Sequence, residues 1–242
     1  MRKKLTSRQI LNAIELPILL RYVLPWERSS VVSIALLSIE NYLAGAAQIQ
    51  ARIQQTRRQL QRNFDGATRH VHEVTTAREH RRNRRLMCCL FADIHFYAIC
   101  WNAIGRNLTV IRSETKSYGM RCAMRPYAAD FTEYKRMRDH LEHFDDRLPG
   151  RRGVKRLKQP WDLGNAFGGV YSFGGDKVDI GPQSLLRLRR VVTSVEMALK
   201  QEFWQTIVKN RPDAIQRLAR MADQDRMLRY LSKRNVKMKT SD

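Results

Sequence analysis

Acidic residues are scarce in this sequence. It has 23 aspartates and glutamates against 45 lysines and arginines, a formal net charge of +22 at pH 7. Arginine outnumbers lysine by 33 to 12. A chain with such an excess repels itself, so an anionic partner is expected, and the guanidinium fork matches phosphate better than an ammonium group does. The composition therefore favours nucleic acid or another phosphate-rich partner, with a merely solubilising basic surface as the alternative.

Cysteine is also sparse, and its spacing argues against a zinc site. The residues are Cys88, Cys89, Cys100 and Cys122, and no two of them form a Cys-x-x-Cys pair. Structural zinc sites usually draw on such pairs. All four lie near apolar or aromatic residues, so we expect buried free thiols in a reducing cytoplasm. No metal ion and no other cofactor is predicted.

Long uninterrupted apolar runs are missing as well. The first 30 residues resemble a signal peptide, but an acid, a proline and an arginine interrupt the apolar run and no small-residue cleavage site follows. The segment Leu86–Ile104 is long enough to span a bilayer. However, Asp93, His95 and Asn102 lie within it, and an acid at mid-bilayer costs about 3 kcal/mol. We expect a buried core helix there and no membrane span.

The apolar periodicity predicts two long helices with a basic segment between them. One helix is expected from Ser30 to Asn63 and the other from Leu86 toward Ile111, with apolar residues on nearly every face of the second. Between them, Asp65–Arg85 begins with a turn signal and ends in a charge run. Ten arginines and three acids lie from Arg52 to Arg85. This segment is either a solvated connector or an arm that contacts phosphates.

The rest of the chain predicts shorter helices and one hairpin. A loop is expected over residues 113–126, because they are rich in Ser, Gly and Pro. Next comes a helix Phe131–Leu148 capped by Asp130, then a small β-hairpin near residues 169–180 around a Gly-Gly turn. Pro182 opens a further helix that Arg211-Pro212 ends, and a basic amphipathic segment follows over 214–234.

The predicted fold class is therefore mainly α. We expect a helical bundle of about four core helices with a small β-hairpin insertion and a C-terminal helix. A single α-helical domain would cover residues 1–210, and residues 211–242 would form a basic C-terminal helical extension.

The helix expected over Phe131–Leu148 carries the strongest candidate site. Its apolar stripe is Met137, Leu141, Phe144 and Leu148, and the opposite face holds Arg138, Asp139 and His143. Asp139 and His143 are an i, i+4 pair, so the carboxylate can accept from the imidazole. His140 lies near the core border and is expected to be structural. The polar face is either a site or a salt-bridged solvent face of little energetic weight.

The hexapeptide Arg138-Asp139-His140-Leu141-Glu142-His143 resembles the signature of the HEPN superfamily, which is Arg, a polar residue, three more residues and His. The resemblance implies a helical bundle that pairs as a homodimer and cleaves RNA without metal. It implies Arg138 and His143 as the catalytic pair and Asp139 as the supporting polar residue. Asp145 stands where one subgroup has a tyrosine, so this chain departs from the subgroup whose toxin is adenylylated there.

The implied chemistry agrees with the residue types. A histidine can take the 2′-hydroxyl proton near neutral pH, and an arginine can stabilise the charge on the attacked phosphate. A cytoplasmic toxin or phage-defence effector with a cognate antitoxin would fit this function. The alternative is a non-catalytic, basic helical nucleic-acid-binding protein. In either case the expected RNA-contacting residues are Arg81, Arg82, Arg84, Arg85, Arg151, Arg152, Lys155 and Arg156.

Overall fold

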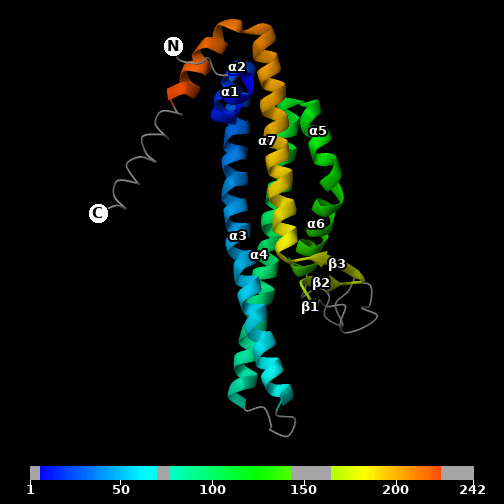
Figure 1. Cartoon of the computed structure of the whole chain (residues 1–242). Helices are drawn as coiled ribbons and strands as arrows, with labels where there is room; N and C mark the ends of the chain where they lie inside the picture. The colour runs from blue at the N-terminus through cyan, green and yellow to red at the C-terminus, as the bar shows by residue number, and fades with distance from the viewer. Residues whose placement is uncertain (1–5, 70–76, 143–164, 225–242) are drawn as a thin grey trace, which may run out of the picture. The chain divides into compact units, whose positions relative to one another are not determined.

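The computed structural model describes residues 6–69, 77–142 and 165–224 and is mainly α, as predicted (Figure 1). The helices are α1 Ser7–Ala13, α2 Leu16–Val23, α3 Trp26–Arg69, α4 Ala77–Thr115, α5 Tyr118–Met124, α6 Ala128–Glu142 and α7 Pro182–Asn210. A 3-10 turn, Arg125–Tyr127, precedes α6, and residues 212–224 are also helical. The strands are β1 Asn165–Phe167, β2 Val170–Phe173 and β3 Asp176–Asp179.

The chain divides into two compact units, each assembled from separate stretches. The first unit consists of Met1–Ala35, Val110–Arg125 and Thr193–Asp242, and the second of Leu36–Thr109 and Pro126–Val192. The division expected from the sequence, a domain of residues 1–210 and an extension of 211–242, stays a prediction.

An aromatic cluster forms the core of the second unit and joins α4 to α6. The rings of Trp101 and Tyr134 stack with their centroids 4.1 Å apart, and Phe131 meets Trp101 edge-on at 5.6 Å. Tyr97 bonds Ser184 of α7 across 2.7 Å, and burial raises the pKa of Tyr97 to about 12. Such rings contribute both buried area and a preferred geometry, which fixes α6 against α4.

The predicted hairpin is present, and a third strand extends it. Strands β2 and β3 pair antiparallel, with Phe173 opposite Asp176, and β1 pairs with β2 to give the order β1-β2-β3. The turn residues Gly174 and Gly175 both have positive φ, at 52° and 86°, which a two-residue turn of this kind requires. The hydroxyl of Tyr134 donates to the carbonyl of Asp179 at the end of β3, so the sheet is tied to α6.

The Asp65–Arg85 segment is more helical than the sequence predicted. Helix α3 continues to Arg69 and α4 already begins at Ala77. A glycine in a helix costs about 1 kcal/mol, and packing can outweigh that local preference. Helices α3 and α4 stabilise each other in this segment, because the Asn63 side chain donates a hydrogen bond to Asn83 Oδ1 at 2.6 Å.

A second departure concerns residues 113–126, where a loop was expected. Helix α5 forms there because two bonds from far along the chain fix its start. Ser117 Oγ donates to Glu202 Oε2 at 2.5 Å and also accepts from the amide of Met120, and the amide of Gly119 donates to the same carboxylate at 3.0 Å. Sequence propensity alone gives no sign of a partner on α7.

The start of α6 also differs from the expectation. Asp130 was expected to cap the helix, but α6 begins at Ala128 and Asp130 lies inside it. Its carboxylate accepts from Arg187 Nη2 of α7 at 2.5 Å. Burial raises the pKa of Asp130, and the Arg187 guanidinium opposes that rise.

The prediction of four buried thiols was wrong for three of them. Cys88, Cys89 and Cys122 are exposed, whereas Cys100 is buried and its burial raises its pKa to about 11. Apolar neighbours in sequence misled the prediction, because residues beside each other on a helix point to different faces.

Two helices are long and apolar enough to cross a membrane by length and composition. They are Trp26–Asp65 and Ala77–Thr115, and less than half of the apolar window of each is buried among the described residues. Helix α4 buries only part of its surface, since Phe96 on it is 54% exposed. The expectation that no segment spans a membrane therefore stays a prediction.

Two helical glycines of the second unit offer a matched stability test. A methyl group at Gly105 would lie 2.8 Å from Phe131 Cδ1, whereas one at Gly45 would have Cys100 Sγ as its nearest neighbour, at 3.8 Å. We expect Gly45→Ala to raise the free energy of unfolding by about 1 kcal/mol. Gly105→Ala is expected to lower it by about 1–2 kcal/mol because the Phe131 ring must shift. Urea denaturation of both variants measures the difference, and equal stabilisation by both would contradict this packing.

Candidate functional site

Two antiparallel helix segments of the second unit form a basic projection, here named the arginine arm. It consists of residues 52–65 of α3 and 77–86 of α4. The bond between Asn63 and Asn83 sets their pairing, and toward the sheet Arg52 forms an ion pair with Asp93. Ile53 and Leu60 are buried in the seam. The arm extends past the three-stranded sheet of the same unit (Figure 1).

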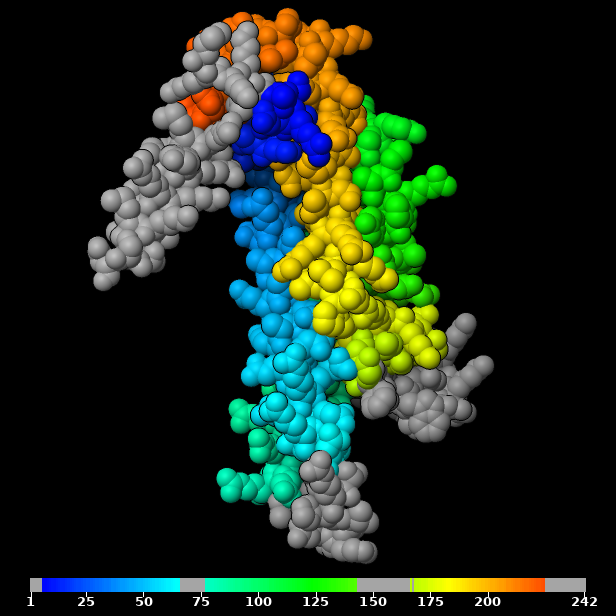
Figure 2. All heavy atoms as spheres, in the orientation of Figure 1, coloured from blue at the N-terminus to red at the C-terminus, as the bar shows by residue number. Residues whose placement is uncertain are grey.

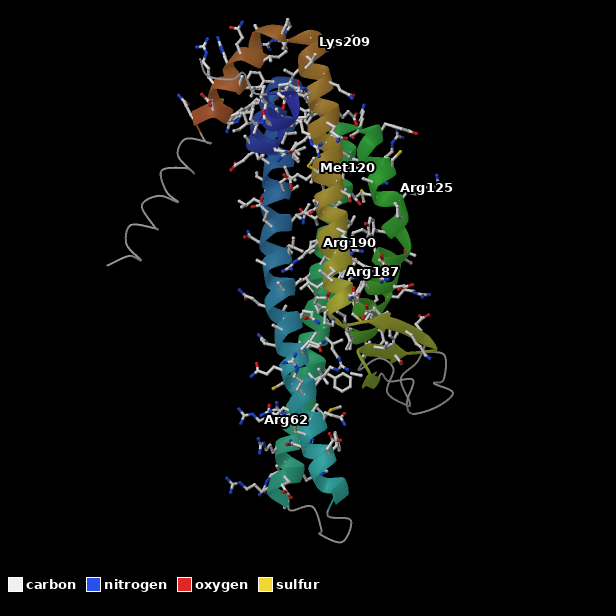
Figure 3. All side chains as sticks on the ribbon, in the orientation of Figure 1. Arg62, Met120, Arg125, Arg187, Arg190 and Lys209 are labelled. Atoms are coloured by element: carbon white, nitrogen blue, oxygen red, sulfur yellow. The ribbon has the colours of Figure 1, made fainter. Side chains whose placement is uncertain are left out.

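Eight arginines of the arm are exposed to solvent. The only acids in these segments are Asp65 and Glu79. Four arginines of α4 share one face of the helix, within an arc of about 100°. They are Arg78, Arg81, Arg82 and Arg85. Nitrogen-tipped side chains project from this region around Arg62 (Figure 3). The exposed residues are Arg52, Arg58, Arg62, Arg78, Arg81, Arg82, Arg84 and Arg85.

The structure bears on half of the expected RNA-contacting residues. Arg81, Arg82, Arg84 and Arg85 are all exposed on the arm. Figure 2 shows the α3 and α4 segments of the arm as a surface of closely apposed side chains. The other four expected contacts, Arg151, Arg152, Lys155 and Arg156, lie outside the described residues.

Helix α6 places Arg138 between two carboxylates. Its Nη2 donates to Asp139 Oδ1, and its Nε lies 3.1 Å from Glu142 Oε2 without the alignment of a hydrogen bond. The side chain of Arg138 is 21% exposed, against 37% and 38% for the two acids. The guanidinium is therefore accessible, but it is already engaged, and a phosphate would have to displace at least one carboxylate from it.

Helix α4 adds an imidazole to this group. His95 Nε2 lies 4.0 Å from Glu142 Oε1, the oxygen that does not face Arg138. The imidazole stacks on Phe96 at 6.1 Å and is 31% exposed. We name Arg138, Asp139, Glu142 and His95 the Arg138 cluster. It unites a fixed cation, two proton acceptors and a titratable ring, which are the group types that proton-transfer chemistry on a phosphodiester uses.

The three expected catalytic residues are only partly described. Arg138 and Asp139 lie together on α6, while His143 directly follows the last described residue of that helix and lies outside the described residues. His140 is fully buried and packs on Phe173 with ring centroids 4.8 Å apart, which confirms its structural role.

Two members of the Arg138 cluster were not among the predicted site residues. Glu142 stands four residues after Arg138, a spacing that pairs opposite charges on a helix, so the sequence did contain that signal. His95 comes from α4, where the sequence predicted a buried core helix. Instead, part of its ring is exposed and its Nε2 makes no hydrogen bond within the described part of the chain.

Within residues 6–69, 77–142 and 165–224, no three His, Cys, Asp or Glu side chains gather in a way that could hold a metal ion. No protein-family model, curated protein or solved structure matches this chain. The resemblance to the HEPN superfamily therefore rests on the six residues of its motif.

Proposed function

We propose that this protein binds nucleic acid, with RNA as the first candidate, through the arginine arm. The observation that carries the proposal is the exposure of eight arginines on two paired helix segments that contain only two acids. Clustered guanidinium groups on one face are the electrostatic footprint of a phosphate-backbone binder.

The length of the arm sets the scale of the interaction. At a rise of about 1.5 Å per residue, the α3 segment is roughly 20 Å long. Phosphates along one strand lie about 3.4 Å apart in a duplex, so the arm covers on the order of six of them. Arginine contacts to the backbone position a strand without reading its sequence. Binding with little sequence preference is therefore expected.

Salt dependence tests this proposal directly. Each phosphate neutralised on a single strand contributes about −0.7 to the slope of log K against log salt concentration. Five or six contacts predict a slope of about −4. Fluorescence anisotropy with a labelled RNA of mixed sequence, titrated at several salt concentrations, measures it. A slope near zero, or no binding at low salt, would contradict the proposal.

A second candidate function is endoribonuclease activity, and one observation favours it. Helices α6 and α4 bring Arg138, two carboxylates and the imidazole of His95 into one cluster. In the mechanism that the HEPN resemblance implies, an imidazole takes the 2′-hydroxyl proton, the oxygen attacks the adjacent phosphorus, and the 5′-oxygen leaves with a proton from a second acid. Arg138 would stabilise the added charge on the phosphate oxygens.

This second function brings further proposals with it. A two-fold homodimer would bring two such Arg–His pairs together across a groove, one group for the attacking oxygen and one for the leaving oxygen. A cytoplasmic toxin or phage-defence effector, held by a cognate antitoxin, fits that activity. The resemblance implies cleavage without metal, so RNA fragments should still form in EDTA. Cleavage that stops in EDTA and returns with a divalent ion would overturn this candidate.

A further inference from the structure

Three basic residues and a serine line an open hollow in the first unit. Its volume is about 520 Å³, and its lining residues are Arg112, Ser113, Lys116 and Arg121. Arg112 and Ser113 come from the last turn of α4, Lys116 from the link that follows, and Arg121 from α5. The hollow therefore sits at the corner between α4 and α5, within a single compact unit.

The lining carries three cations and a hydroxyl group but no acid. The acids closest to it in the chain or across α5 are occupied elsewhere. Glu114 pairs with Arg28, with Nε and Oε2 3.2 Å apart. Glu202 accepts from Ser117 and from the amide of Gly119. Among the described residues, no carboxylate forms an ion pair with the three cations of the hollow, so their charge is available to a ligand.

The backbone at Lys116 supports a binding role for this corner. Lys116 has φ of 51°, the left-handed region in which a helix usually ends with glycine. A side chain in that region is strained by about 1–2 kcal/mol, and such residues concentrate at functional sites. The Lys116 amide donates to the carbonyl of Arg112 at 3.0 Å. Lys116 therefore places an ammonium group one helical turn after Arg112, at a position where glycine would contribute no charge.

Arg121 is oriented by an aromatic ring rather than by an acid. Its guanidinium lies 5.6 Å from the centroid of the Tyr118 ring, a cation–π distance that leaves the N–H groups free to donate. The preceding residue of α5, Met120, is fully buried, so the helix is anchored in the first unit (Figure 3). The hollow is thus bordered by a fixed helix with a positioned donor.

We propose that this hollow is a phosphate-binding site, distinct from the arginine arm, that takes the phosphate group of a ligand. Two guanidinium groups and one ammonium group can surround a phosphate, and Ser113 offers a further donor. The phosphate could belong to a small phosphorylated compound or to a polynucleotide, and the variants below separate these two sources.

Pyrophosphate is the probe for the first experiment. Isothermal titration calorimetry on the full chain at low salt compares the natural protein with the variant Arg112→Gln/Lys116→Gln/Arg121→Gln. We expect pyrophosphate affinity to fall by about tenfold or more in the variant, since charge-assisted bonds to the anion are lost. Far-UV circular dichroism checks that the variant is folded.

A matched control removes the same charge elsewhere in the same unit. Lys209→Gln/Arg217→Gln/Arg220→Gln alters three exposed basic residues and also lowers the net charge from +22 by three. Pyrophosphate affinity of this control should stay within about twofold, because only general screening changes. Equal losses in both variants, or no pyrophosphate binding by any of the proteins, would overturn the site.

A measurement on the natural protein covers the case in which the hollow variant does not fold. Phenylglyoxal modifies accessible arginines, and pyrophosphate should protect Arg112 and Arg121 while leaving Arg217 and Arg220 reactive. Equal reactivity with and without pyrophosphate would exclude the site.

The source of the phosphate follows from RNA affinity measured on the same variants. If RNA affinity falls together with pyrophosphate affinity, the hollow takes a polynucleotide phosphate. If only pyrophosphate affinity falls, the ligand is a small phosphorylated compound. Loss of RNA binding in arm variants that still bind pyrophosphate would separate the arm from the hollow, so the two proposals can fail independently.

Discussion

Replacing Arg81, Arg82, Arg84 and Arg85 by glutamine is expected to weaken RNA binding by roughly 10²- to 10³-fold near 0.1 M salt. All four side chains are exposed, and none has an ion pair among the described residues. Each lost phosphate contact should remove about 0.7 from the salt slope, so the slope should become shallower by about 3. Anisotropy titrations at several salt concentrations give both quantities.

The control for this variant must remove equal charge from exposed positions off the arm. Arg189→Gln, Arg190→Gln, Arg217→Gln and Arg220→Gln do so, since all four residues are exposed. If local contacts matter, this control should change RNA affinity by only a few fold and the slope by less than about 1. If both sets of substitutions weaken RNA binding equally, RNA is attracted by the overall net charge of +22 and the arginine arm is not its binding site.

The parts of the fold that the sequence predicted are those with strong local signals. Pro182 opens α7 where expected, and the helix ends at Asn210, before Arg211-Pro212. The Gly174-Gly175 turn joins β2 and β3 because glycine alone takes its positive φ without strain. In these elements the local conformational preference of the sequence agrees with the tertiary structure, so a single sequence is enough to predict them.

The elements that the sequence did not predict depend on partners far along the chain. Helix α5 is held by Glu202, which lies 85 positions after Ser117. Helix α4 already begins at Ala77, and this early start depends on the helix beside it, because Asn63 of α3 donates to Asn83. Asp130 carries a capping signal, yet Arg187 of α7 engages it inside the helix. Long-range side-chain bonds override weak local propensities in all three places.

The residues of the candidate sites also fall into those that the sequence alone revealed and those that only the fold brings together. Arg81, Arg82, Arg84 and Arg85 form a basic run in the sequence. Clustered charged side chains are rarely buried, so their exposure could be predicted. The pairing of Arg138 with Glu142 was implicit in the spacing. His95 could not be assigned to the cluster, because its approach to Glu142 depends on how α4 packs against α6. The basic hollow likewise combines residues of two helices and the link between them, and only the fold brings them together.

Substitution of the motif residues should separate the two candidate functions. If the protein cleaves RNA, His143→Ala is expected to lower the cleavage rate by about 10²- to 10⁴-fold, the usual contribution of a general acid or base. Arg138→Gln should lower it by about 10²- to 10³-fold, because the added charge on the phosphate loses its cation. RNA affinity should stay within a few fold, since the arginine arm remains. Single-turnover cleavage of labelled RNA, with saturating protein, measures the rate.

Two further variants make this prediction specific. Arg136→Ala removes a neighbouring arginine of α6 that instead pairs with Asp176 at 2.9 Å, and it should leave cleavage unchanged. His95→Ala should lower cleavage only a few fold, because His95 contacts Glu142 and would act by positioning Arg138. Should His95→Ala abolish cleavage while His143→Ala does not, the imidazole of α4 would be the acid–base group and the motif resemblance would be misleading. If no variant changes the rate, or the natural protein leaves RNA intact, the clamped guanidinium of Arg138 is a structural ion pair and the protein binds nucleic acid without cleaving it.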